Sequence, residues 1–170
     1  MGARLYSSKG PVTPDGKAVE AVKPRPYLRT KYNEGFGRFS PQADPHWVAY
    51  QSDETGRSEI YIASFPEPRR KLQVTSDGGR FPAWGPDAKE LFYVSADDKL
   101  MVITLRMGRD GIESSALREV FPFNQSSYMS LYDIAPDGRR ILIQQREAVS
   151  QNIEVIVNWP ALLRKGTAVP

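Results

Sequence analysis

Two short acidic turns carry the side chains best suited to bind a ligand. Asp53 and Glu54, with Arg57 close behind, follow one apolar run, and Asp97 and Asp98 follow another. Carboxylates at such turns can supply oxygen ligands to Ca²⁺, and paired carboxylates can act as acid and base in glycoside hydrolysis. Neither turn has the alternating Asp spacing of a calcium loop, so we expect no metal ion. These five residues are candidate binding residues on surface loops, and solvated turn residues are the alternative interpretation.

The sequence lacks several of the residues that nucleophilic catalysis requires. His46 is the only histidine, it lies beside Asp44 and Pro45 in a turn, and no Gly-x-Ser-x-Gly elbow is present. A serine hydrolase needs a nucleophile, a base and an orienting acid. The chain has no cysteine, which excludes thiolate nucleophiles, thiolate zinc sites and disulfides. We therefore predict no catalytic residues, no metal and no cofactor.

The charge balance argues against two classes of partner. Lys plus Arg number 23 and Asp plus Glu number 20, for a net charge of +3, with the signs interspersed. Nucleic-acid binding would need a larger, clustered excess of positive charge, so no nucleic-acid partner is expected. No apolar run reaches the roughly 20 residues of a membrane span, and no apolar stretch typical of a secretion signal lies near the N-terminus. We expect no membrane insertion, and the residues themselves leave the localisation open.

Short β-rich runs dominate the chain. They lie between turns marked by 13 glycines and 14 prolines, and each has the usual length of a strand. The runs are Trp47–Gln51, Glu59–Phe65, Leu91–Ser95, Leu100–Leu105, Arg140–Gln145 and Ile153–Trp159. The best helical candidate, Pro160–Lys165, is one or two turns long. The predicted fold class is all-β.

The turns repeat along the chain. Pro41, Pro86 and Pro136 are 45 and 50 residues apart. Each proline turn follows the first strand of a copy and is followed by a second strand, a polar turn and a third strand. The first two copies continue into a fourth strand at Lys71–Thr75 and Arg118–Phe121. A period of 40–50 residues with four short strands is typical of a β-propeller blade, and a plain β-sandwich would not repeat these landmarks.

The motif residues resemble a known family. Gly37-Arg38-Phe39-Ser40-Pro41, Trp47–Ser52, Glu59–Ile62 and the closing Val157–Leu163 are similar to TolB-like, Pro-Asp-Gly-type β-propeller repeats. The pattern is most similar to C-terminal propellers of large bacterial proteins, including kinase-linked ones, over about Pro24 to Lys165. The resemblance implies a propeller fold and suggests a location outside the cytoplasm. In the first copy, the turn Pro41–His46 is one residue longer than in the others and lacks the glycine.

We expect three four-stranded blades that form half of a six-blade ring. The third copy has only three strands, so the strand at 25–30 would close a blade and bring the total to twelve. Three blades leave two apolar faces bare, which predicts a homo-oligomer, a twofold dimer that closes the ring. The expected parts are a poorly ordered segment 1–23, a propeller segment 24–165 with blades at about 37–78, 79–123 and 128–159, and a tail 166–170.

The expected function is a non-enzymatic binding or scaffold module whose mouth loops face a protein or peptide partner. The alternative is a hydrolase of the esterase, peptidase or glycosidase type built on the ring, since fold does not determine function. We assign Trp47 and Trp84 to matching positions in adjacent blades, and we expect both indoles to be buried between blades rather than to form a ligand cage.

Overall fold

The computed structural model describes residues 5–7, 24–108, 111–122, 132–146 and 151–157. These residues form thirteen β-strands. Every residue in a regular element of this part is in a strand, which confirms the all-β prediction. The helical candidate Pro160–Lys165 lies outside the described residues. No helix in the described part is long and apolar enough to cross a membrane.

Three consecutive antiparallel sheets make up the body of the chain. The first has the order β3-β4-β5-β6, the second β10-β9-β8-β7 and the third β11-β12-β13. A two-stranded hairpin, β1-β2, precedes them. The bounds are β1 Leu5–Ser7, β2 Arg25–Leu28, β3 Glu34–Phe39, β4 Trp47–Ser52, β5 Glu59–Ser64, β6 Lys71–Gln73, β7 Gly79–Trp84, β8 Glu90–Ser95, β9 Lys99–Gly108, β10 Gly111–Pro122, β11 Tyr132–Ile134, β12 Arg140–Arg146 and β13 Gln151–Val157.

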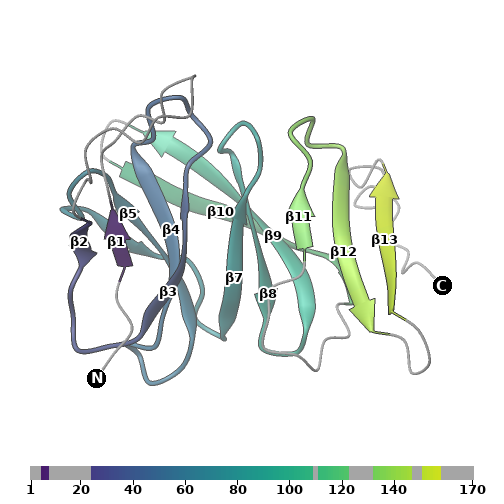
Figure 1. Cartoon of the computed structure of the whole chain (residues 1–170), viewed down its shortest axis with the longest axis horizontal. Helices are drawn as coiled ribbons and strands as arrows, with labels where there is room; N and C mark the ends of the chain where they lie inside the picture. The colour runs from purple at the N-terminus through teal and green to yellow at the C-terminus, as the bar shows by residue number, and fades with distance from the viewer. Residues whose placement is uncertain (1–4, 8–23, 109–110, 123–131, 147–150, 158–170) are drawn as a thin grey trace.

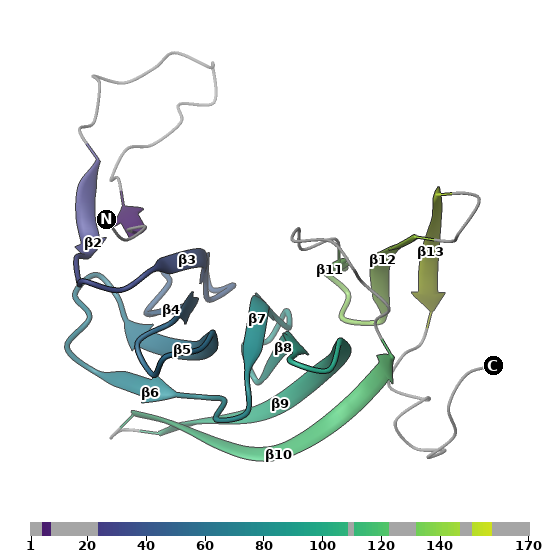
Figure 2. The same ribbon diagram turned by 90° about the horizontal axis from the view of Figure 1, so that it is seen from below.

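The sheets follow one another around an open arc. The first strand of each sheet, β3, β7 or β11, lies on the concave side of the arc, and the fourth strands β6 and β10 lie on the convex side (Figure 2). The hairpin β1-β2 lies at one end of the arc and β13 at the other (Figure 1). This is the architecture of a partial β-propeller, as the repeat predicted.

Alternation along the strands produces an apolar layer between each pair of neighbours. In β4, Val48 and Tyr50 are buried against the hairpin, whereas Ala49 is buried against the second sheet. In β8, Leu91 is buried against the first sheet and Phe92 against the third. Because successive side chains of a strand point to opposite faces, an interior blade is apolar on both faces and needs a neighbour on each side.

The turn from the first to the second strand differs in length between sheets. One backbone hydrogen bond closes it in all three, from Ser40 N–H to Trp47 O (2.9 Å), from Gly85 N–H to Glu90 O (2.8 Å) and from Ala135 N–H to Arg140 O (2.9 Å). The first turn is therefore two residues longer than the others, not one as its sequence suggested. Phe39 pairs with Val48 and Trp84 pairs with Leu91, so the register matches Val48 with Leu91. The counterpart of Trp84 is therefore Phe39, and the predicted match between Trp47 and Trp84 is wrong.

The expected parts can be compared with these strands. The three sheets cover Glu34–Gln73, Gly79–Pro122 and Tyr132–Val157. The expected blades were at about 37–78, 79–123 and 128–159. Three residues of the segment 1–23 form β1, and β1 pairs with β2. The described part thus holds thirteen strands rather than twelve.

Candidate functional site

Every second connection emerges at the same end of the sheets, because neighbouring strands are antiparallel. Four described connections, 29–33, 53–58, 74–78 and 96–98, form what we call the loop end. The opposite end, with connections 40–46, 65–70, 85–89 and 135–139, is called the far end. All five candidate binding residues lie at the loop end, whereas the exposed His46 lies at the far end.

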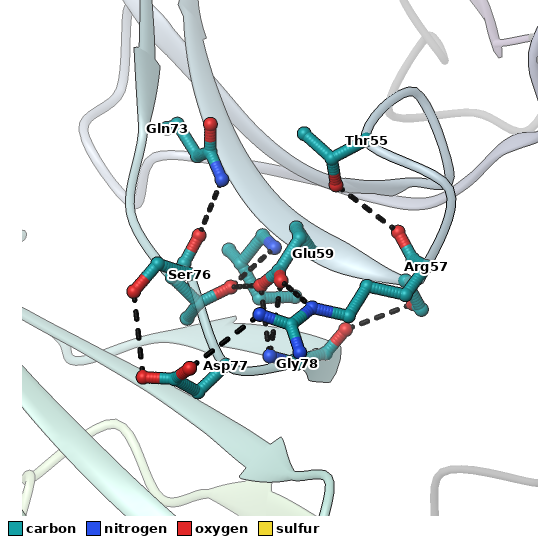
Figure 3. Close-up of polar contacts among 11 residues, drawn as sticks. Thr55, Arg57, Glu59, Gln73, Ser76, Asp77 and Gly78 are labelled. Atoms are coloured by element: carbon teal, nitrogen blue, oxygen red, sulfur yellow. Dashed lines mark hydrogen bonds and ion pairs between the residues drawn. The ribbon is translucent and has the colours of Figure 1, made fainter.

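A buried carboxylate joins two loops of the loop end (Figure 3). Glu59 is 1% exposed and accepts hydrogen bonds from the Gly78 backbone N–H, 3.0 and 3.1 Å from its two oxygens. The Thr75 hydroxyl donates to the same carboxylate, while it accepts a hydrogen bond from the Ile60 N–H at 2.9 Å. Glu59 belongs to the first sheet and Gly78 to the connection that leads into the second, so this carboxylate fixes one sheet against the next.

Arg57 adds a charge to this contact. Its Nε lies 2.7 Å from a Glu59 oxygen, and one of its terminal nitrogens lies 3.5 Å from Asp77. The Asp77 side chain is 98% exposed. The fork of the guanidinium therefore runs from a buried carboxylate to an exposed one (Figure 3). This geometry suits recognition of planar polar groups.

The second acidic turn touches the same loop. Gly78 has a φ of 95°, and a Cβ added to it would lie 2.8 Å from the Cβ of Ala96. Only glycine fits here, because the backbone is left-handed and the neighbouring chain is close. Ala96 directly precedes Asp97 and Asp98. The loop 74–78 thus lies between the two turns that the sequence singled out.

Asp53 holds the neighbouring connection in place. It accepts hydrogen bonds from the Asn33 backbone N–H at 2.9 Å and from the Asn33 side-chain amide at 2.6 Å. These hydrogen bonds hold the pKa of the Asp53 carboxyl below its ordinary value, because they favour the charged form. Its neighbour Glu54 forms an ion pair with Lys71, at 2.6 Å.

Asp97 and Asp98 are also paired within their own sheet. The Ser95 hydroxyl donates to Asp97 at 2.6 Å, and Lys99 lies 3.3 Å from it. The hydrogen bond from Ser95, followed by that from Lys99, lowers the pKa of the Asp97 carboxyl. Asp98 forms an ion pair with Arg80. Among the described residues, no group of three His, Cys, Asp or Glu is placed to hold a metal ion.

Sequence reasoning missed the centre of this site. Glu59 was part of the quoted Glu-Ile-Tyr motif. A glutamate in a strand does not by itself indicate that its carboxylate is buried and accepts hydrogen bonds from a distant connection. Asp77 and Gly78 lie in a Ser-Asp-Gly-Gly turn that was not singled out. The signal that could have found them is the repeated threonine, since Thr30 and Thr75 each lie four residues before the first strand of a sheet.

Comparisons with known proteins were made at the level of sequence and of structure. No family model matches the chain, and no curated protein matches it. Among solved structures the chain is similar to TolB from Acinetobacter baumannii, with a TM-score of 0.43 and 17% sequence identity. The match covers 95% of this chain and 50% of that one, so this chain spans about half the length of that protein.

Proposed function

We propose that the chain is a non-enzymatic binding module that presents the loop end to a protein or peptide partner. The observation that carries the proposal is the Glu59–Gly78 contact with Arg57 and Asp77 beside it, since it fixes two loops and leaves charged atoms exposed. A surface whose loops are already ordered loses little conformational entropy on binding. Rigid sheets that carry such loops are a common way to position binding groups.

The binding residues on this proposal are Asp53, Glu54, Arg57, Asp97 and Asp98, with Asp77 added from the structure. Their charges are paired within the chain at the contacts given above. A partner would therefore contact hydrogen-bonding groups and ion pairs rather than unpaired charges. Exposed ion pairs of this kind set the orientation and the association rate of a partner, and through the association rate they contribute to affinity. We expect binding that weakens with salt.

The resemblance to C-terminal propellers of large bacterial proteins, some of them kinase-linked, fits this role. A module without chemistry of its own would serve such a protein by recruiting a partner. This context is part of the proposal and stands on the sequence pattern alone.

A random-peptide display selection against the purified chain tests the proposal. We expect enriched peptides whose affinity falls at least tenfold in the double variant Asp77→Ala/Asp97→Ala. The matched control is Asp44→Ala/Asp87→Ala at the far end, which should leave affinity unchanged. Equal loss in both variants, or no enriched peptide, would overturn the proposal.

The hydrolase alternative has its own test. A panel of ester, glycoside and peptide substrates should show no turnover above background if the module only binds. Turnover that His46→Ala abolishes would favour the alternative, because His46 is the only histidine in the chain.

A further inference from the structure

The two ends of the arc are each incomplete, and in complementary ways. The first and second sheets have four strands, whereas the third has three, and in the described part β13 pairs only with β12. At the other end of the arc, the hairpin β1-β2 carries a strand with no four-stranded sheet around it. Within the described residues, one end therefore has a sheet of three strands and the other end has a two-stranded hairpin outside the four-stranded sheets.

β2 has the position of a fourth strand. It leads into β3 through a connection whose Thr30 comes two residues after the strand ends and four before β3 begins. The fourth strand β6 leads into β7 with Thr75 at the same two distances. The two threonines differ in their acceptors: the Thr30 hydroxyl donates to the buried Glu34, the first residue of β3, whereas the Thr75 hydroxyl donates to the buried Glu59 of β5.

The face of the first sheet at the hairpin end is only partly covered. Phe39 and Trp84 hold equivalent positions, two residues before a proline at the end of the first strand of their sheets. Trp84 packs on the preceding sheet and is 8% exposed, whereas Phe39 is 51% exposed. Tyr27 and Leu28 cover part of this face, and the inner strands of a preceding blade would cover Phe39.

The outer face of the third sheet is bare in the same sense. Leu142 is the counterpart of Phe92, because Asp133 pairs with Leu142 as Ala83 pairs with Phe92. Phe92 is covered by the next sheet and is 0% exposed, whereas Leu142 is 45% exposed. In the backbone register, Leu142 of β12 pairs with Val155 of β13.

We propose that two copies of this chain close a six-blade ring, in which β2 of each copy is the fourth strand of the partner's third sheet. β2 and β13 lie at opposite ends of the arc (Figure 2), so they do not pair within the described part of one copy. A second copy related by a twofold axis brings Leu142 of one chain against Phe39 of the other, twice per ring. Each contact then repeats the packing of Trp84 on Ala49, the counterpart of Leu142 in the first sheet.

The ring requires one exchange of partners. β1 holds the same place beside β2 that β5 holds beside β6, which is the place β13 takes in the ring. β1 pairs with β2 over three residues, with a register shift between Leu5 and Tyr6. β13 therefore replaces β1 beside β2, and the longer β12–β13 ladder is kept intact.

The solution mass is the first test. We expect a species of about twice 19.1 kDa at micromolar concentration in native mass spectrometry. A stable, folded monomer would overturn the proposal, as would a larger assembly or a monomer that captures only a different protein.

Cross-linking is the second test, and it stays informative even if a substitution at the contact weakens the ring. The chain has no cysteine, so the double variant Phe39→Cys/Leu142→Cys carries only the two designed thiols. A short bifunctional maleimide should join two copies of it. The matched control Phe39→Cys/Leu117→Cys should stay uncoupled, because Leu117 is a similarly exposed leucine (53%) on β10, away from both ends. Coupling in both variants, or in neither, would overturn the proposal.

A charge placed at the contact gives the third test. Leu142→Glu should convert the dimer to monomer or make it insoluble, since the ring would bury an unpaired charge. Leu117→Glu should leave the mass at the dimer value. Equal masses for the two variants would count against the ring.

Discussion

The two carboxylate oxygens of Glu59 lie 3.0 and 3.1 Å from the backbone N of Gly78 and accept its N–H, although Glu59 begins β5 and Gly78 lies in the connection that leads to β7. The carboxylate is buried and has Arg57 and Thr75 as further donors. A buried charge is stable only when its partners surround it. The contact therefore couples the stability of the first and second sheets at the end that carries the candidate site.

Replacing Glu59 tests this coupling. Glu59→Ala should lower the free energy of unfolding by about 3 kcal/mol, because it leaves the Gly78 N–H and Arg57 without their acceptor. The measurement is urea unfolding monitored by circular dichroism. The matched control Glu113→Ala removes an exposed glutamate on β10 and should change the free energy of unfolding by less than about 0.5 kcal/mol. Equal effects would show that the contact does not stabilise the fold.

The tryptophans test the layer between the first and second sheets. Trp84 is buried there, and its indole N–H donates to Arg38 O at 3.0 Å. Trp84→Ala should cost about 3–5 kcal/mol of stability. Trp47→Ala should cost less, because Trp47 is only half-buried. A larger loss for Trp47 than for Trp84 in the same unfolding experiment would contradict the layer described here.

The sequence predicted the sheets well and the site poorly, for physical reasons. Strand positions follow from local alternation, so Trp47–Gln51 and Leu91–Ser95 were found nearly to the residue. Turn length is harder to judge, because two extra residues before Trp47 change the register without changing the pattern. Glu59 was missed as a centre because its burial depends on a loop almost 20 residues away. Contacts of that range leave no periodic signal in a single sequence.

The turn carboxylates predict how stability depends on pH. The hydrogen bonds from Asn33 lower the folded-state pKa of Asp53 below the ordinary value of 3.8. A lowered pKa contributes stability that is fully present above that ordinary value and is lost as pH falls through the folded-state value. Asp53→Asn should therefore be less stable than the parent at pH 7, and the difference should shrink as pH falls below 3.8.

Urea midpoints at several pH values measure this difference. Asp44→Asn, on an exposed turn at the far end, is the control and should track the parent protein at every pH. A gap between Asp53→Asn and the parent that stays constant from pH 7 to below 3.8 would contradict the role given to Asn33.

Truncation separates the roles of β1 and β2. Tyr27 and Leu28 are buried against the first sheet, and the Tyr27 hydroxyl donates to Ser64 O at 2.7 Å. Deleting residues 1–23 removes Leu5, which is only partly buried beside them, and should lower the melting temperature slightly. Deleting residues 1–30 should also uncover Tyr50 and Tyr61 and leave a sheet face bare, which promotes aggregation.

Melting temperature and solubility of the two truncated chains decide the point. The longer deletion should lose several degrees more, because each kcal/mol of stability corresponds to about 2–8 °C in domains of this size range. Equal melting temperatures and equal solubility would show that β2 contributes nothing to the first sheet. The same result would also leave the ring without its fourth strand, since a strand that can be removed without effect is not one that a second copy needs.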